Sequence, residues 1–438
     1  MSTRTVDRDD TASTRVRCAA CGVTLSDRTA QSTCTACGGL LVVEHVPHHR
    51  GNALRAVFDE RAAAALRDVS STGRSGVWRF RELVLDADDD EIVSHPEGNT
   101  PLISRAAIAQ FAGVDGILVK HEGHNPTGSF KDRGMTVALT QARRVGARAV
   151  ACASTGNTSA SLSAYAAQAG IPSFVFVPEG RIALGKLAQT LAYGARTLQI
   201  RGDFDDCMRL ALDASDKLGV YLVNSVNPFR IEGQKTIVFE MLQQLNWQAP
   251  DWIALPAGNL GNTSAFGKAL AEAHHLSLID RLPRLLAVQA SGASPFAQAF
   301  AGGFVDRIRV RAETRATAIR IGDPASWDRA VRAIEATNGM VISVTDDDIF
   351  AAKRVIDRCG VGCEPASAAS VAGVRALVQR GTIRPQDRVI AVLTGHLLKD
   401  PAGGEVDVSA APEPPLTPDD ALAMVERVLA QATESSQP

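Results

Sequence analysis

Short apolar runs alternate with helix-like stretches from about residue 98 to residue 400, and this alternation limits the fold more than any other feature. The runs are GILVK, RAVACAS, PSFVFVP, WIALPAG, LLAVQA and VIAVLTG, separated by stretches such as GMTVALTQARRVG. Apolar strands that alternate with helices predict parallel sheets buried on both faces. Because 438 residues can bury two sizeable cores, we expect an α/β protein with two open parallel-sheet domains and helices on both faces.

Local composition predicts where the chain divides. The first residues are polar and mixed in charge, and a Pro-rich stretch, APEPPLTPDD, precedes a last helix-like run, ALAMVERVLAQA. The predicted parts are a disordered tail at 1–16, a small cysteine module at 18–45, a larger domain made of 46–140 and 230–410, a smaller α/β domain at 141–229, and a C-terminal helix and tail at 411–438.

Charge and hydropathy argue against two classes of partner. The formal net charge is -2, so nothing draws the chain toward nucleic acid or an anionic membrane surface. The sequence shows neither an apolar run long enough to span a membrane nor a signal peptide. We therefore expect a cytoplasmic protein with a small-molecule ligand, no nucleic acid and no membrane.

The segment HNPTGSFKDRG carries the first candidate for chemistry, Lys131. This lysine follows a Gly-Ser turn and an aromatic residue, and helix-compatible sequence comes after it. A lysine at such a place could form a Schiff base with a carbonyl cofactor. An ordinary surface lysine at a helix start is the alternative from this segment alone.

Three polar turns follow apolar runs: ASTGNTS, PAGNLGNTS and TGHLLKD. Ligands of open parallel sheets bind outside the carboxyl ends of the strands, so the three turns could share one site. In the second turn, Gly258 and Gly261 let backbone N–H groups approach an anion, and Asn259 and Asn262 add donors, which suggests a phosphate cradle. A plain turn is the alternative. Neither a dinucleotide fingerprint nor the Walker lysine is present, so a nucleotide-dependent enzyme is disfavoured.

The other two turns offer hydroxyl and amide groups. Ser154, Thr155, Asn157 and Thr158 lie within one turn at a predicted helix start, where side chains and N–H groups can bind oxygen atoms. Thr394 ends a strand, and its hydroxyl can hydrogen-bond a ring nitrogen without imposing a charge. A helix N-cap and an ordinary strand end are the alternatives.

Together these residues resemble the fold type II pyridoxal-phosphate (PLP) enzymes, the family of the tryptophan synthase β chain, and within it the threonine synthases. The motifs that carry the resemblance, in order, are GNTPL, NPTGSFKDRG, STGNTSAS, EGQKT, PAGNLGN and TGHLLKD, between about residues 90 and 402. The resemblance implies that Lys131 holds PLP and serves as the catalytic lysine, Asn157 bonds the ring oxygen and Thr394 meets the pyridine nitrogen. It also implies that the cofactor's phosphate is bound by Gly258, Asn259, Leu260, Gly261 and Asn262.

The resemblance further implies a carbon–oxygen lyase of threonine biosynthesis, which converts O-phospho-L-homoserine and water to L-threonine and phosphate by γ-elimination and β-addition. Candidate substrate-binding residues are Thr100, Ser154, Thr155, Thr158, Arg230 and Lys235. The sequence departs from the family at Leu397, where glycine is more usual. Another fold type II lyase or dehydratase is therefore the first alternative, and a non-catalytic binding protein is the second. The family also suggests a homodimer.

The cysteine module contains two Cys-x-x-Cys pairs, each followed by glycine. Their members are Cys18, Cys21, Cys34 and Cys37. This spacing is typical of a zinc ribbon, in which two knuckles supply four thiolates to one ion. Since no ligand position would remain open, the zinc should be structural. Thiol redox activity is the alternative, although a redox pair would not need the second copy.

Overall fold

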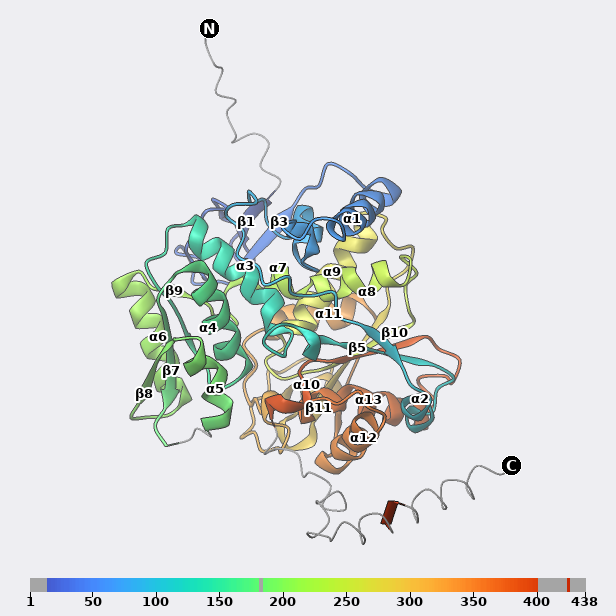
Figure 1. Ribbon diagram of the computed structural model, residues 1–438. Coiled ribbons are helices and arrows are strands. Elements are labelled where there is room, and N and C mark those ends of the chain that lie inside the picture. The colour runs from blue at the N-terminus through green and yellow to red at the C-terminus, as the bar shows by residue number, and fades with distance from the viewer. Residues whose placement is uncertain (1–13, 181–183, 401–423, 426–438) are drawn as a thin grey trace, which may run out of the picture. The chain divides into compact units, whose positions relative to one another are not determined.

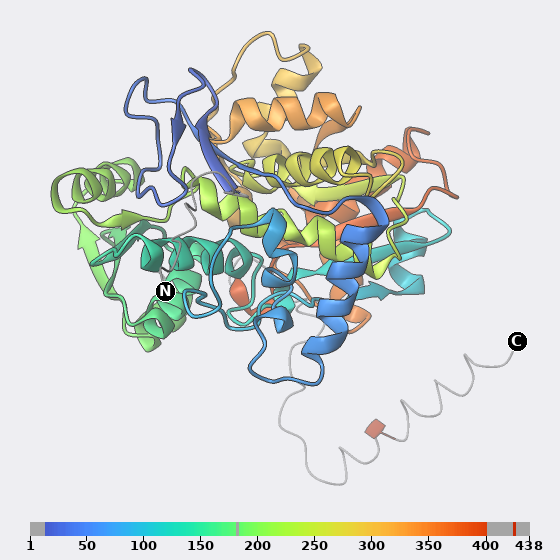
Figure 2. The same ribbon diagram turned by 90° about the horizontal axis from the view of Figure 1, so that it is seen from above.

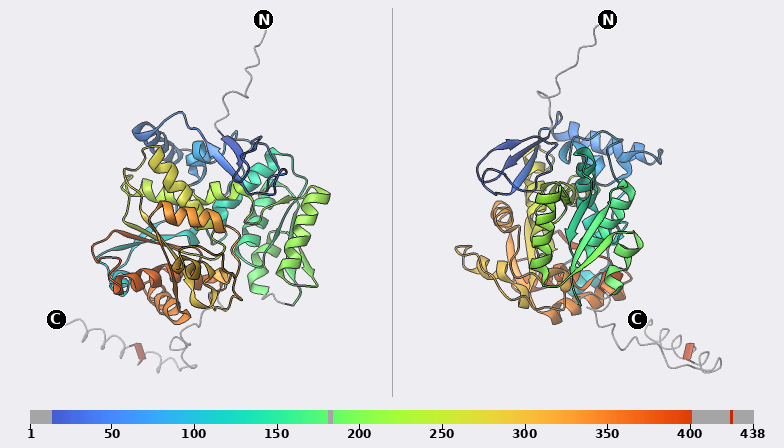
Figure 3. Two further views of the ribbon diagram at one scale, coloured as in Figure 1. Left: turned by 180° about the vertical axis from the view of Figure 1, so that it is seen from behind. Right: turned by 90° about the vertical axis from the view of Figure 1, so that its left-hand side faces the viewer.

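The computed structural model describes residues 14–180, 184–400 and 424–425 (Figure 1). The described residues between 14 and 400 fall within one compact unit, which holds a six-stranded sheet, a four-stranded sheet and a small antiparallel sheet. The view from behind in Figure 3 shows the four-stranded sheet and its helices, in green, beside the larger sheet. The predicted fold class, two parallel sheets covered by helices, is confirmed.

The larger sheet has the strand order β12-β11-β10-β13-β5-β4, and only the β4–β5 pair is antiparallel. Its strands are β4 (Leu102–Ser104), β5 (Ile117–His121), β10 (Trp252–Pro256), β11 (Arg284–Ala290), β12 (Met340–Val344) and β13 (Val389–Leu393). Along β10 the side chains alternate between two hydrophobic cores, with Ile253 and Leu255 in one and Trp252 and Ala254 in the other. Both faces of this sheet are therefore buried, as its apolar strands predict.

Helices cover the two faces of the larger sheet. The first core contains side chains of α8 (Thr236–Gln244), α9 (Gly261–His275) and α11 (Trp327–Ala336). The second contains side chains of α2 (Ala106–Ala112), α12 (Asp346–Arg358) and α13 (Pro365–Gln379). Figure 1 shows α9 and α11 on one side of β10 and β11, and α12 and α13 on the other.

The smaller sheet is entirely parallel, in the order β8-β7-β6-β9. Its strands are β6 (Val150–Ala153), β7 (Ser173–Pro178), β8 (Arg196–Ile200) and β9 (Tyr221–Leu222). Side chains of α3 (Lys131–Arg144) and α4 (Asn157–Ala169) pack on one face, and side chains of α6 (Phe204–Leu218) pack on the other. Helix α5 (Leu184–Ala192) connects β7 to β8.

Helix α3 belongs to both cores. Met135 and Leu139 lie in the core of the smaller sheet, whereas Val137 lies in the first core of the larger sheet. The boundary predicted between residues 140 and 141 therefore falls inside a helix. The division into 46–140, 141–229 and 230–410 stays a prediction, and α3 with its neighbour α7 (Pro228–Gln234) joins the two sheets.

The cysteine ribbon, which we define as residues 14–45, is an antiparallel sheet in the order β2-β1-β3. Its strands are β1 (Thr14–Cys18), β2 (Thr24–Leu25) and β3 (Leu41–His45). Val16 pairs with Val43, and both side chains are buried in the core that covers the larger sheet. The predicted disordered tail at 1–16 is therefore wrong for residues 14–16, because Val16 is needed for that core; residues 1–13 lie outside the described residues.

The remaining helices connect these layers. They are α1 (Gly51–Ala65), α10 (Pro295–Ala301) and the 3-10 turns Thr72–Arg74, Trp78–Leu83, Glu122–His124, Ser291–Ala293, Thr317–Ile319 and Leu397–Lys399. Figure 2 shows α1 in blue alongside the helices of the larger sheet. The predicted C-terminal helix and tail at 411–438 lie outside the described residues except for Met424 and Val425, which are helical.

Among the described residues, the helices are all too short or too polar to cross a membrane.

Candidate active site

Lys131 is the first residue of α3, and the loop before it is fastened to the end of β13. The Phe130 N–H donates to the Thr394 carbonyl at 3.0 Å, and Ser129 forms a bridge with Gly395. Gly128 has a φ of 87°, a conformation that glycine adopts without strain. These contacts bring Lys131 and Thr394 together, as predicted for one site.

The amine of Lys131 lies in a buried, electropositive setting. Burial lowers its pKa to about 7; the nearby Arg230 guanidinium also lowers it, and Glu364 opposes the shift. The amine lies 4.2 Å from the centre of the Phe130 ring. A lysine with such a pKa is about half uncharged at pH 7, far more than an ordinary lysine, and its neutral form can act as nucleophile or base.

Asn157 and Thr394 meet at a buried carboxylate, that of Glu364. The Asn157 amide donates to Glu364 Oε2 at 3.0 Å, and the Thr394 hydroxyl donates to Glu364 Oε1 at 3.2 Å. Ser367 contacts the same hydroxyl at 2.9 Å. Burial raises the pKa of Glu364.

Sequence reasoning missed Glu364. The signal was present, because Glu364 is the lone charge in the otherwise small and apolar run VGCEPASAASVAGV before Arg375. A carboxylate there must either be paired or hold a proton. Its two hydrogen bonds place it between the residues predicted to contact the cofactor ring.

The glycine loop, residues 258–262, leads from β10 into α9, where buried polar side-chain atoms lack hydrogen-bond partners. Both side-chain polar atoms of Asn262 and the hydroxyl of Thr263 are buried without a hydrogen-bond partner in the described part of the chain. They lie in the first turn of α9, where free N–H groups favour an anion. A Cβ added at Gly258 would lie 3.0 Å from Ile319 Cα, so a side chain there would crowd the backbone of Ile319.

Other members of the loop hold its shape. Asn259 donates to the Ser225 hydroxyl at 2.8 Å and accepts from the Ala325 N–H at 2.6 Å. Leu260 has a φ of 62°, an uncommon value for a residue with a Cβ. These hydrogen bonds fix the position of the loop before the first turn of α9.

Four of the predicted substrate residues remain near these groups. Ser154, Thr155 and Thr158 are half-buried at the start of α4, beside Asn157. Arg230 is buried, donates to the Val223 carbonyl at 3.1 Å, and has a buried Nε without a partner in the described structure. Burial lowers the pKa of Arg230 to about 10.

Thr100 is engaged elsewhere. It belongs to what we call the arginine network, in which Arg133 and Lys120 neutralise two buried glutamates, Glu122 and Glu240. The Thr100 hydroxyl donates to Glu122 at 2.7 Å and accepts from Arg133 at 3.1 Å. Because its hydrogen bonds are used within this network, Thr100 is withdrawn as a substrate ligand.

Lys235 is also withdrawn. Its ammonium is fully buried between Glu232 at 2.5 Å and Glu272 at 2.7 Å. An ammonium held by two carboxylates is not free to bind a substrate. Leu397 begins a 3-10 turn, a backbone conformation open to leucine, so the missing glycine causes no strain there.

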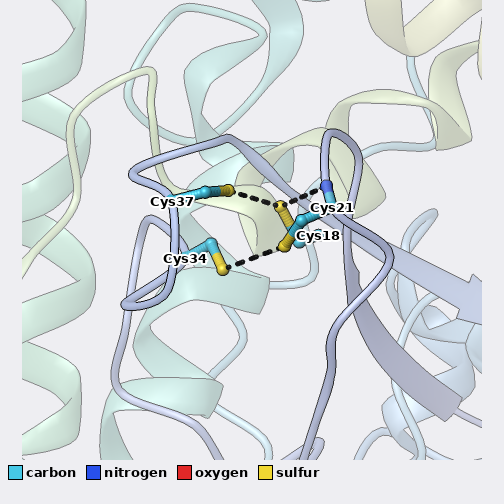
Figure 4. A group of neighbouring side chains, drawn as sticks. All are labelled: Cys18, Cys21, Cys34 and Cys37. Atoms are coloured by element: carbon cyan, nitrogen blue, oxygen red, sulfur yellow. Dashed lines mark hydrogen bonds between the residues drawn. The ribbon is translucent and has the colours of Figure 1, made fainter.

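The four cysteines of the ribbon converge (Figure 4). Their sulfur atoms all lie within 4.8 Å of one another, with Cys18 and Cys37 at 3.5 Å and Cys21 and Cys34 at 3.7 Å. Sulfurs bound tetrahedrally to zinc at about 2.3 Å lie about 3.8 Å apart. Four converging thiols at this spacing fit a zinc ion.

Comparison with known proteins agrees with this site. The family model described as "Pyridoxal-phosphate dependent enzyme" matches residues 93–395. Among solved structures, tomato (Solanum lycopersicum) threonine deaminase isoform 2 has a TM-score of 0.61 at 18% identity, covering 83% of this chain and 93% of that one. Maize serine racemase has a TM-score of 0.60 at 21% identity, covering 77% and 94%. These two likenesses concern the fold, and with the family match they define a fold type II PLP enzyme.

Sequence relatives narrow the class. The threonine synthase of Methanocaldococcus jannaschii is 43% identical over 400 residues, covering 91% of this chain and 95% of that protein. That of Mycobacterium tuberculosis is 48% identical over 351 residues (80% and 94%), and that of Synechocystis is 47% identical over 349 residues (77% and 89%). The chain belongs to the threonine synthase family of PLP-dependent enzymes.

Proposed function

We propose that this chain catalyses the threonine synthase reaction, in which O-phospho-L-homoserine and water give L-threonine and phosphate. The observation that carries the proposal is the meeting of Lys131, Arg230 and the Asn157–Glu364–Thr394 group beside a loop with unmet polar atoms. Relatives named threonine synthase, 43–48% identical, support the choice of reaction.

The site residues fit PLP. The unmet groups of Asn262 and Thr263 suit its phosphate, Lys131 suits its aldehyde, and Thr394 suits its ring nitrogen. When bound, PLP withdraws electron density from the α carbon of an amino-acid substrate. When PLP is bound, the neutral Thr394 hydroxyl, which donates to Glu364 in this structure, would turn to the ring nitrogen without adding the charge that an acidic partner would supply.

Lys131 is the proton carrier in this proposal. The reaction removes a proton from Cα and then from Cβ, expels phosphate from Cγ, adds a proton at Cγ, and adds the hydroxyl of water at Cβ while a proton returns to Cα. An amine whose pKa is about 7 can both accept and return protons at neutral pH. The same lysine therefore serves several of these transfers.

Arg230 and the start of α4 are proposed to bind the anionic groups of the substrate. The unpartnered Nε of the buried Arg230 can donate to a phosphate oxygen, and such a charge-assisted bond is stronger than a neutral one. Ser154, Thr155 and Thr158 add hydroxyl groups at a helix N-terminus, where negative charge is favoured.

The test is to supply purified protein with PLP and O-phospho-L-homoserine and to measure phosphate and threonine together. We expect equal amounts of both products, lost in the Lys131→Ala variant. Visible absorbance of bound cofactor without threonine would instead point to another lyase or dehydratase, and L-threonine and L-serine are the substrates to try next.

We propose that the cysteine ribbon binds one structural zinc ion through Cys18, Cys21, Cys34 and Cys37. The convergence of the four sulfur atoms supports this, and a site with four thiolates leaves no open position for catalysis. Metal analysis of the native protein should give about one zinc per chain, and Cys18→Ser should abolish it. A folded native preparation without metal would contradict the proposal.

The cytoplasmic location and the homodimer stay predictions. Light scattering of the purified protein would measure its molar mass in solution and so test the homodimer.

A further inference from the structure

The cysteine ribbon is tied to α7 by a buried carboxylate. Glu232 Oε2 lies 2.7 Å from His45 Nε2, at the end of β3, and both side chains are 1% exposed. Lys235 and Lys268 each approach the same carboxylate at 2.5 Å. Burial lowers the pKa of His45 to about 4, so His45 is neutral; its Nε2–H donates to Glu232, and its Nδ1 accepts from the Thr14 hydroxyl at 3.3 Å.

The ribbon also holds the far end of α3. Gln141 donates to the carbonyls of Asp27 at 2.7 Å and Thr29 at 3.0 Å, and Arg144 pairs with the Asp27 carboxylate at 2.8 Å. Lys131 is the first residue of the same helix. The ribbon therefore contacts both helices that bring cationic side chains to the site.

Helix α7 contacts the rest of the site through the two residues after Glu232. A Cβ at Gly233 would overlap the Arg133 carbonyl, so α7 and α3 are in backbone contact two residues from Lys131. The Gln234 side chain lies 3.0 Å from where a Cβ of Gly134 would be and 3.4 Å from where a Cβ of Gly261 would be. Three consecutive residues of α7 thus contact three parts of the molecule: Glu232 contacts the cysteine ribbon, Gly233 contacts α3, and Gln234 lies near α3 and the glycine loop.

We propose that Glu232 is a positioning residue: by anchoring α7 to the cysteine ribbon through His45, it fixes Lys131, Arg230 and the glycine loop in the arrangement that binds the cofactor. The inference rests on the proposed function for the identity of the cofactor. Packed interiors transmit such constraints because they cannot be compressed to absorb a shift. The ribbon is then a part of the site's frame, in addition to covering apolar surface.

The chain offers a matched pair of ribbon variants. His45→Phe removes the link to Glu232 and keeps a ring of similar size, while Lys235 and Lys268 still neutralise the carboxylate. Glu44→Gln changes the preceding residue of the same strand, where Glu44 forms an exposed pair with Arg17 at 2.7 Å. Only the first variant touches the proposed link.

The experiment measures the dissociation constant of PLP for each full-length variant by visible absorbance, together with amide hydrogen exchange of α3 and α7 in cofactor-free protein. We expect His45→Phe to weaken PLP binding about tenfold and to speed exchange in α7, with Glu44→Gln like the wild type. Removal of zinc from the wild type by a chelator should act in the same direction.

Unchanged PLP affinity and unchanged α7 exchange in His45→Phe would overturn the proposal, and the ribbon would then only stabilise the fold. If His45→Phe fails to fold, Glu232→Gln decides by the same two readouts, because it weakens the same link while Lys235 and Lys268 keep Glu272 as a partner. Failure of the wild type to bind PLP would instead refute the proposed function. The hydrogen-exchange measurement is made on cofactor-free protein, so it tests the positioning role of Glu232 independently of PLP binding.

Discussion

Helix α3 contributes Lys131 to the candidate active site and Arg133 to the arginine network. These two groups of buried polar side chains differ in how many of their hydrogen-bonding atoms have partners. In the arginine network, Arg133 has partners at all three guanidinium nitrogens, Glu122 and Glu240 among them. At the site around Lys131, the polar atoms of Asn262, Thr263 and the Arg230 Nε are buried without partners among the described residues. Buried polar atoms are rarely left so, and at this site a bound cofactor and substrate would supply the missing bonds.

The two lysines of this comparison should differ most in reactivity. Lys120 is fully buried and paired with Glu240 at 2.6 Å, whereas Lys131 has a pKa of about 7. Burial lowers the pKa of Lys120 as well, but its amine is held by the Thr100 carbonyl and by the Glu240 and Gln244 side chains. We therefore expect PLP capture to occur at Lys131 alone, with a rate that rises with pH to a plateau above a midpoint near 7. Borohydride reduction and peptide mapping at several pH values measure this, and label at Lys120 would break the comparison.

Truncation within the arginine network should cost stability. Arg133→Met leaves two buried carboxylates short of a partner, and breaking a buried pair in this way costs about 3–5 kcal/mol. Urea unfolding of the cofactor-free protein measures the loss. Arg17→Met, which removes an exposed pair with Glu44, is the control and should change stability by less than about 0.5 kcal/mol. Equal losses in both variants would show that the network is not structural.

Two asparagines of the glycine loop sharpen the contrast. Asn259 is hydrogen-bonded and Asn262 is not, so Asn259→Ala should destabilise cofactor-free protein by about 1 kcal/mol. Asn262→Ala should leave that stability unchanged and weaken PLP binding about tenfold, the loss of about 1.4 kcal/mol. Thermal unfolding and PLP titration separate the two effects. Unchanged PLP affinity in Asn262→Ala would contradict its role in the site.

Substitution of Glu364 should give the smallest effect, a change in how the free energy of unfolding depends on pH. Burial raises the pKa of its carboxyl, so the folded protein holds this proton more tightly than the unfolded chain. The contribution to stability is present at low pH and is lost as pH rises through the range just above the ordinary glutamate value of about 4.3. Relative to wild type, Glu364→Gln should therefore gain stability across that range. Denaturant unfolding at pH 4 to 7 is the measurement, and a constant difference would contradict it.

The sequence predicted the strands that are apolar on both faces, because burial leaves a plain signal. It named no strand at β4, β8, β9 or β12. Strands β4 and β9 are only three and two residues long, and the residues of β8, RTLQI, are mixed and mostly exposed at the sheet edge; nothing comparable explains the omission of β12, MVISV. Lys131, Asn157 and Thr394 could be grouped because each follows a strand or turn with a local pattern.

Partners far apart in the sequence could not be predicted. Thr100 is engaged by Glu240 and Lys235 by Glu272, which lie 140 and 37 residues away. The pairing of Lys235 with Glu232, three residues away, could have been suspected from the sequence, but these distant pairings could not, so two ordinary-looking polar residues were taken for ligands. Glu364 was missed although its signal is local. An acidic residue before a proline is also typical of a helix start, so it attracted no functional interpretation.

The contact between Gly233 and the Arg133 carbonyl has a consequence for altering this enzyme. Any side chain at position 233 would have to push apart the two helices that frame the cofactor, so mutant libraries aimed at new substrates should leave EGQ intact. Diversity is better placed at Ser154, Thr155 and Thr158, which are half-buried and carry no such packing demand.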